Sequence, residues 1–277
     1  MLQKNLYFLV SLIFLSLTIL HAETLPEILR IMPLGDSITY DNTHDDDVHP
    51  RPVQSRIGYR GPLWSMLNDA NVSFDFVGPK MAGQKYAPNF DPDNAGYPGQ
   101  TSRQIADKTY PLLENYNPNI ILLHIGTNDN SKSVKYVNQI LDWVDTYEND
   151  TNQIVRVIVA LILDRKVHDL DIEEFNHNLK KLITKRLKNG DQLTLVDMYR
   201  GAGLNDSDYL DRTHPNTKGY KKMARVWYKA LITPYTPELH IFPHTLVKSS
   251  LIQSLHINES THSVTFVTKV PTSGIIF

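Results

Sequence analysis

The sequence predicts an α/β fold in which helices cover both faces of one parallel β-sheet. Short apolar runs alternate with longer amphipathic stretches along most of the chain, which is typical of consecutive βαβ units. The 277 residues are 41% hydrophobic and 21% charged, as in ordinary globular proteins. A chain of this length can bury a sizeable core without disulfide bonds, and this sequence contains no cysteine.

The expected elements follow from the spacing of apolar residues. Five short apolar runs are expected to form the strands of one open sheet, at residues 28–34, 73–78, 119–125, 154–161 and 192–197. Between and after them, apolar residues recur three and four positions apart, which predicts helices at residues 60–70, 101–116, 132–148, 170–188 and 216–232.

The first 22 residues are interpreted as a secretory signal peptide rather than as part of the fold. Lys4 precedes an uncharged, mostly apolar run of 15 residues at 6–20, and Ala22 offers a small residue at a cleavage site. An uncleaved membrane anchor is the alternative, although a spanning helix usually needs about 20 apolar residues. We therefore expect a secreted protein with no stable membrane span after cleavage, whose globular domain covers residues 23–234.

Two segments do not fit the alternating pattern. Residues 41–56 form a polar insertion, and residues 235–277 form a C-terminal extension with alternating Val, Phe and Thr and no helical period. The extension could hold extra strands or the start of a truncated module, and the sequence assigns it no function.

The composition narrows the possible chemistry. The net charge of -2 leaves no basic excess, so nucleic acid is not an expected partner. The absence of cysteine excludes thiolate nucleophiles and thiolate metal sites. Any covalent catalysis must therefore use an oxygen or a nitrogen nucleophile.

The motif Gly35-Asp36-Ser37 directly follows the first expected strand. A glycine-led turn there would present the serine hydroxyl at the carboxyl edge of the sheet, where open α/β folds bind ligands. The alternative is that Ser37 only caps the next helix.

The motif at residues 126–129, Gly-Thr-Asn-Asp, follows the third expected strand and so reaches the same edge. The Asn128 amide could donate to a developing oxyanion there, or it could only form an Asx-turn. The loop at 96–102 opens the helix after the second strand and offers backbone N–H donors from Gly96 or Gly99.

A general base requires a histidine held by a carboxylate, and the pattern Asp-x-x-His occurs three times, at 41–44, 46–49 and 211–214. About one occurrence is expected by chance, so the spacing alone decides nothing. Asp211 and His214 follow the last strand and can return to the edge that holds Ser37, whereas the other two pairs lie in the polar insertion.

The insertion itself, with His and Asp at 44–49, could hold a metal ion. A solvated acidic loop is the interpretation we favour, whose carboxylates could pair with Arg51, Arg56 and Arg60, and we expect no metal and no cofactor. Asp36 and Tyr97 are expected to contact the substrate.

These motifs, in this order, resemble those of the SGNH (GDSL-type) hydrolases, over about residues 28–232. The resemblance implies a flavodoxin-like, three-layer αβα fold with a five-stranded parallel sheet, and an esterase or lipase activity. Within that family, stretches such as IMPLGDSITY, LLHIGTND and DRTHPNTKGYKKMA look most like the secreted carbohydrate acetyl-esterases that act on acetylated xylan. An acylated carbohydrate is then the expected partner.

The resemblance also implies residue roles. The nucleophile falls on Ser37, the base and its carboxylate on His214 and Asp211, and the oxyanion donors on Ser37, Gly99 and Asn128, with Gly96 as a competing choice for the glycine. The implied reaction is acyl transfer to water through an acyl-serine.

Two other readings stay open, a lipase or lysophospholipase on the same scaffold and a non-catalytic carbohydrate-binding protein. An α/β-hydrolase is excluded because Thr39 stands at the last glycine of its G-x-S-x-G motif.

Overall fold

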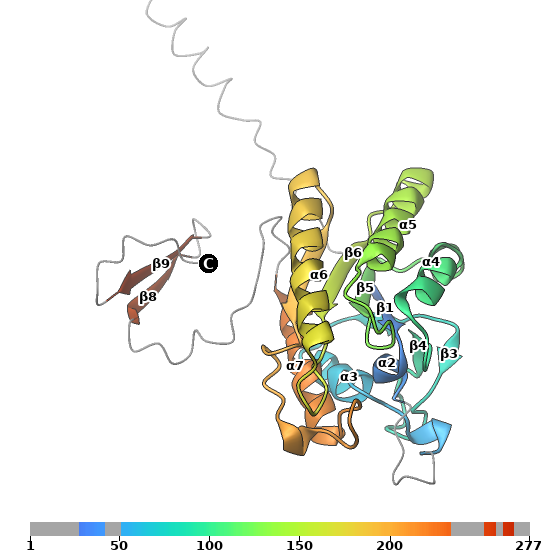
Figure 1. Cartoon of the computed structure of the whole chain (residues 1–277). Coiled ribbons are helices and arrows are strands. Elements are labelled where there is room, and N and C mark those ends of the chain that lie inside the picture. Colours follow the sequence, from blue (N-terminus) through green and yellow to red (C-terminus); the bar gives the residue numbers. More distant parts are fainter. Residues whose placement is uncertain (1–27, 42–50, 234–251, 259–262, 269–277) are drawn as a thin grey trace, which may run out of the picture.

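The computed structural model describes residues 28–41, 51–233, 252–258 and 263–268. Its main part is a three-layer α/β/α arrangement around a mostly parallel sheet, so the predicted fold class is confirmed (Figure 1). The predicted signal peptide and most of the polar insertion lie outside the described residues. Within the described residues, no helix is long and apolar enough to span a membrane.

All five predicted strands are present and run parallel to their neighbours. In spatial order the sheet is β3-β4-β1-β5-β6-β7, and β2 also pairs with β1. The predicted strands are β1 (Leu29–Gly35), β2 (Phe74–Phe76), β5 (Ile120–His124), β6 (Arg156–Leu161) and β7 (Leu193–Asp197).

The expected count of five strands was too low, because two short strands complete the sheet beside β1. In β4 (Asp93–Gly96), Ala95 and Gly96 pair in parallel with Leu34 and Gly35, whereas β2 pairs with the first half of β1. The edge strand β3 (Lys80–Met81) runs antiparallel to β4. Their short sequences, Lys-Met and Asp-Asn-Ala-Gly, carry no apolar run from which a strand could be predicted.

The five predicted helices are present and divide between the two faces of the sheet (Figure 1). A further helix, α2 (Ser37–Tyr40), is a single turn that leaves β1 directly. The five are α3 (Arg60–Asp69), α4 (Ser102–Tyr116), α5 (Lys135–Thr151), α6 (Leu170–Asn189) and α7 (Thr217–Ile232).

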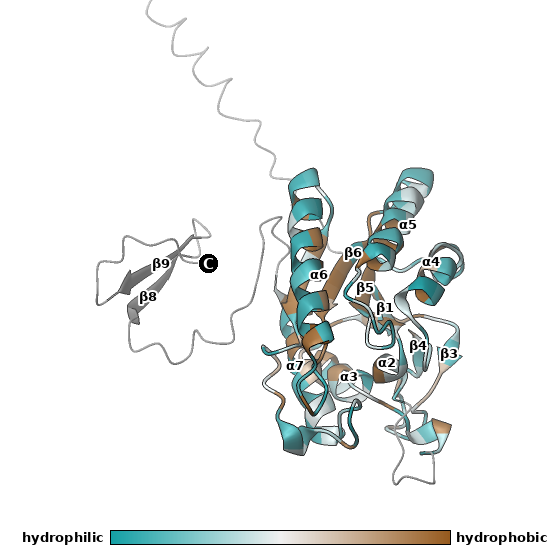
Figure 2. Cartoon of the chain, viewed as in Figure 1, coloured by the Kyte–Doolittle hydropathy of each residue, from teal (hydrophilic) through white to brown (hydrophobic). Residues whose placement is uncertain are grey.

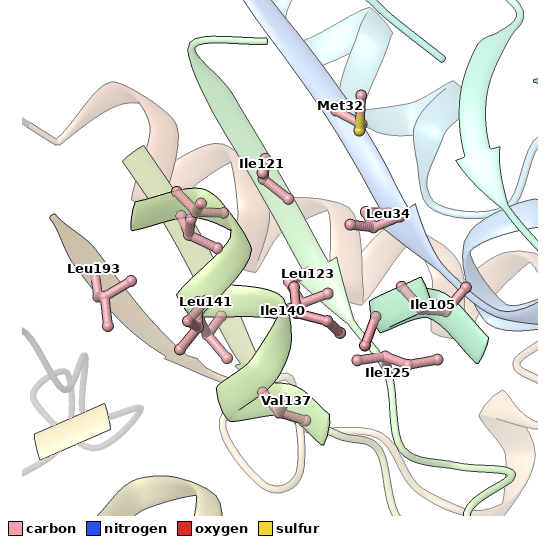
Figure 3. Packing of buried hydrophobic residues seen from close by; sticks show 14 of the residues in the cluster. Met32, Leu34, Ile105, Ile121, Leu123, Ile125, Val137, Ile140, Leu141 and Leu193 are labelled. Carbon is pink, nitrogen blue, oxygen red and sulfur yellow. The ribbon is translucent and has the colours of Figure 1, made fainter. Parts of the chain in front are cut away.

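The alternation of side chains along the strands creates two hydrophobic cores. In β5, Ile121 and Leu123 face the core under α4, α5 and α6, while Ile120 and Leu122 face the core under α3 and α7. Figure 2 shows hydrophobic strands between helices whose outer faces are hydrophilic. Figure 3 shows the first core, where Ile140 from α5 packs near Leu123 and Ile125. Because helices bury both faces of the sheet, the carboxyl ends of the strands are held at one rigid edge.

Two strands lie in the C-terminal extension. β8 (Ile252–Asn258) and β9 (Ser263–Thr268) form a separate antiparallel two-stranded sheet with an irregularity between Ile252 and Ser254. The division of the chain into a hydrolase domain and an extension stays a prediction.

Candidate active site

Ser37 lies at the carboxyl edge of the sheet because β1 turns directly into α2. Asp36 caps this single turn, since its carboxylate accepts a hydrogen bond from the Ile38 N–H at 2.9 Å. The turn is too tight for a side chain at Gly35, where a Cβ atom would lie 2.2 Å from the backbone oxygen of His124. The capping residue of α2 is thus Asp36, and Ser37 is the first residue of the helix, so the alternative in which Ser37 only caps the helix is wrong.

Ser37, His214 and Asp211 form one hydrogen-bonded chain although 177 positions separate the serine and the histidine. The Ser37 Oγ lies 2.9 Å from His214 Nε2, and His214 Nδ1 lies 2.8 Å from Asp211 Oδ2. This is the geometry in which an imidazole accepts a hydroxyl proton while a carboxylate fixes its tautomer.

The Asp211 carboxylate is held in its ionised form by its own loop. Its Oδ1 accepts the backbone N–H groups of Thr213 and His214 at 2.6 and 2.7 Å. Partial burial acts to raise the pKa of Asp211, but these two donors and the imidazole outweigh it and leave the pKa below its ordinary value. A stable negative charge therefore faces His214 Nδ1.

The glycine loop favours Gly99 over Gly96 as an oxyanion donor. Gly96 ends β4, its N–H already donates to the Asn94 side chain at 3.0 Å, and a Cβ there would lie 2.7 Å from the Tyr40 nitrogen. Gly99 is exposed and has a φ of +75°, and nothing lies within 4 Å of the position of a Cβ. No acceptor within the described part of the chain receives its N–H.

One amide hydrogen of Asn128 is engaged, and the other has no acceptor among the residues that the structure describes. Its Nδ2 donates to the Gln100 backbone oxygen at 3.0 Å, which ties the loop after β5 to the glycine loop. The neighbouring Asp129 accepts the Ser102 N–H at 2.6 Å and also the Ser102 hydroxyl, at the start of α4. Asp129 belongs to the Gly-Thr-Asn-Asp motif, but nothing in that motif indicates its contact with Ser102, 27 positions away.

Residues 34–222 match the sequence model of the GDSL-like lipase/acylhydrolase family. The chain belongs to this family. With esterases among its relatives, this GDSL-like hydrolase is a carboxylic ester hydrolase. The resemblance drawn from the motifs is thereby confirmed.

The relatives include esterases of carbohydrates. The chain is 28% identical to a multidomain esterase of Ruminococcus flavefaciens over 238 residues, which are 73% of this chain but only 28% of that protein. A family 3 carbohydrate esterase of Clostridium thermocellum is 26% identical with a TM-score of 0.62, and covers 73% of this chain and 94% of its own. One from Talaromyces cellulolyticus is 25% identical with a TM-score of 0.61, at 74% and 97% coverage.

Asp36 does not take the substrate-contacting position expected for it in this GDSL-like hydrolase. Its side chain is fully buried and caps α2, and its other carboxylate oxygen, Oδ2, has no hydrogen-bond partner among the described residues. Burial raises the pKa of Asp36 to about 6, and the hydrogen bond from Ile38 only partly offsets this. Asp36 therefore shapes the turn under Ser37 from inside the protein.

Replacing Asp36 with Asn is expected to stabilise the protein at pH 8 and to have little effect at pH 4. Because folding raises the pKa of Asp36, the protonated side chain stabilises the folded state. This stabilisation is complete below the ordinary pKa of 3.8 and is lost as the pH rises through the folded-state pKa of about 6. The difference between these two pKa values corresponds to about 3 kcal/mol of unfolding free energy once Asp36 is fully ionised. Denaturant unfolding of Asp36→Asn and wild type at both pH values measures it, and an equal or lower stability of the variant at pH 8 contradicts it.

Tyr97, the other expected substrate residue, lies next to the glycine loop and is half-buried. Its backbone N–H donates to the Gly35 oxygen at 2.8 Å, and its ring lies 5.2 Å from Lys80 Nζ and 5.8 Å from Lys108 Nζ. This places Tyr97 on the side of the site that Gly99 forms, and its contact with substrate stays a prediction.

The described ends of the polar insertion make structural contacts. Asp41 is fully buried and accepts the N–H groups of Ile57 and Gly58, both at 3.0 Å, and pairs with Arg51 at 2.9 Å. Of the three arginines that could pair with the insertion, Arg60 has a buried guanidinium that donates to backbone carbonyls, including that of Thr39 at 3.0 Å. The described residues contain no cluster suited to a metal ion, and positions 42–50 lie outside them.

Proposed function

We propose that this GDSL-like hydrolase removes short acyl groups, above all acetyl groups, from esters of carbohydrates through a Ser37 acyl-enzyme. The observation that carries the proposal is the chain from Ser37 Oγ through His214 to Asp211, at 2.9 and 2.8 Å. It lies beside two groups of donors suited to an oxyanion, the glycine loop and Asn128.

In the proposed reaction, His214 Nε2 takes the Ser37 proton as the hydroxyl oxygen attacks the ester carbonyl. Asp211, held ionised by its loop, stabilises the imidazolium that forms. The N–H groups of Ser37 and Gly99 and the free Asn128 amide hydrogen donate to the oxyanion. The imidazolium then protonates the departing alcohol, and water activated by His214 releases the acid.

The acyl and alcohol parts of the substrate are proposed from the relatives. Two of the structures with TM-scores above 0.6 are family 3 carbohydrate esterases. A third, 25% identical with a TM-score of 0.61, is an acetyl esterase mutant with an acetate ion. These likenesses support an acetyl group on a carbohydrate over a long acyl chain on a lipid.

Secretion is part of the same proposal, and it rests on the sequence alone. The charged start, the apolar run at 6–20 and the small residue Ala22 support a cleaved signal peptide. The N-terminal sequence of protein purified from culture medium tests it, and a mature chain that still begins at Met1 contradicts it.

Purified protein is expected to hydrolyse 4-nitrophenyl acetate faster than a long-chain 4-nitrophenyl ester, and to release acetate from acetylated xylan. Ser37→Ala, assayed beside it, is expected to lose all three activities. A preference for the long chain contradicts the acetyl assignment and favours a lipase. Tight binding of xylan without hydrolysis of any ester contradicts the enzyme mechanism and favours a binding protein.

A further inference from the structure

The segment between β6 and α6, residues 162–169, contacts both loops of the proposed active site, although its sequence matches none of the motifs. Its backbone meets the loop that carries Asp211 and His214. The Lys166 N–H donates to the Arg212 oxygen at 2.8 Å, and the Tyr209 hydroxyl donates to the Asp164 oxygen at 2.8 Å.

The same segment also meets the loop that carries Asn128. The guanidinium Nη2 of Arg165 donates to the Thr127 backbone oxygen at 3.3 Å and approaches Asn130 Oδ1 at 3.5 Å. Arg165 is itself held by an ion pair with Asp169 at 3.2 Å. Asn128 is thus flanked on both sides by residues that Arg165 contacts.

The segment is stiffened by its own hydrogen bonds. The Asp164 carboxylate accepts the N–H groups of Arg165 and Asp169 at 2.8 and 3.0 Å and pairs with His168 at 2.7 Å. At the end of β6, the buried side chain of Asn176 bonds both the N–H and the oxygen of Ile162, at 2.7 and 2.8 Å. A segment fixed in this way can hold one loop at a constant distance from the other.

Tyr209 is suited to anchor the histidine loop because it lies at the neck of that loop. It forms an antiparallel bridge with Pro215, and the next residue, Leu210, donates its N–H to the His214 oxygen at 2.9 Å. The Tyr209 side chain is buried, and burial raises the pKa of its hydroxyl, which therefore stays a donor.

We propose that residues 162–169 act as a brace that fixes the position of His214 relative to Asn128, with Tyr209 and Arg165 as positioning residues. The inference rests on the proposed roles of Ser37, His214 and Asn128. The base acts on Ser37 while Asn128 donates to the oxyanion, so the distance between the two loops determines whether both act on one transition state. A displacement of about 1 Å can cost up to about 100-fold in rate.

The test compares Tyr209→Phe and Arg165→Met with wild type and with Tyr220→Phe. The Tyr220 hydroxyl is also buried but has no hydrogen-bond partner among the described residues, so its removal is a matched control. For each protein, kcat and KM for 4-nitrophenyl acetate are measured per active site titrated with a serine-directed reagent, together with the melting temperature. Because only reactive sites are counted, a lower kcat reports a change in positioning and not a smaller amount of folded protein.

We expect Tyr209→Phe and Arg165→Met each to lower kcat about tenfold with KM within about twofold of wild type, because the backbone contacts of the brace remain and the loss is partial. Arg165→Lys, which keeps one cationic donor, is expected to recover part of the rate. Tyr220→Phe is expected to match wild type.

Wild-type kcat per titrated site in both Tyr209→Phe and Arg165→Met overturns the brace, whatever their melting temperatures. A change confined to KM overturns it too, since it indicates substrate contact rather than positioning. Ser37→Ala, run in parallel, separates the two claims. If Ser37→Ala is fully active, the proposed function fails; if it is inactive while the two brace variants match wild type, only the brace fails.

Discussion

Ser37→Ala and His214→Ala are each expected to lower kcat for 4-nitrophenyl acetate by about 10⁴- to 10⁶-fold, as removal of a nucleophile or base does in other serine hydrolases. Both variants are expected to fold, because within the described part of the chain the Ser37 hydroxyl bonds only the imidazole, and the imidazole lies in a partly exposed loop. Initial rates and circular dichroism on the same preparations measure both expectations. The double variant is expected to be no slower than either single one, since the two residues act as a unit.

Matched controls come from histidines outside the proposed site. His177 is exposed on α6, and His44 and His49 complete the other two Asp-x-x-His patterns. Replacing any of the three with Ala is expected to leave turnover near wild type. A loss of activity in His44→Ala or His49→Ala comparable with that of His214→Ala would move the base into the insertion and contradict the assignment.

Asn128→Ala is expected to lower kcat by about 100- to 1000-fold with a smaller change in KM, because an oxyanion donor acts mainly on the transition state. Part of this effect comes from the loss of the bond from Nδ2 to the Gln100 oxygen, which positions the loop. Asn128→Asp keeps the shape but replaces both amide donors with a charged acceptor, so it is expected to be at least as slow as Asn128→Ala.

Asn115→Ala provides the comparison for this substitution. Asn115 also donates an amide hydrogen to a backbone oxygen, that of Pro111 at 2.7 Å, but it does so on the exposed side of α4. Steady-state kinetics of the three variants against wild type measure the difference. If Asn128→Ala kept wild-type kcat, Asn128 would have only the Asx-turn role that the sequence also allowed.

The positions of Ser37, Asn128 and His214 could be predicted because each follows a strand of a parallel sheet, and the carboxyl ends of such strands share one edge. The topology of a parallel sheet thus predicts which loops meet. It also distinguishes the Asp-x-x-His pattern at 211–214 from the other two. In the structure, His214 reaches Ser37 at 2.9 Å, whereas Asp41 of the first pattern is a buried structural acceptor.

Other features could not be predicted because no local pattern encodes them. The strand β4 has the sequence Asp-Asn-Ala-Gly and pairs with the second half of β1, which β2 does not reach. The surroundings of the buried Asp36 include Thr127 and His214, which are distant in sequence. Likewise, Asp129 bonds Ser102 across 27 positions, and Tyr209 bonds Asp164 across 45.

The central claim, that Ser37 carries the acyl group during turnover, can be tested by mass spectrometry of the reacting protein. Wild type is mixed with excess 4-nitrophenyl acetate, quenched in acid within the first turnovers and digested. The account predicts that the peptide containing Ser37 gains the mass of one acetyl group, that the gain disappears once substrate is consumed, and that Ser37→Ala shows none. Turnover by wild type with no acetylated Ser37 at any time, or the same labelling elsewhere in active Ser37→Ala, would contradict it.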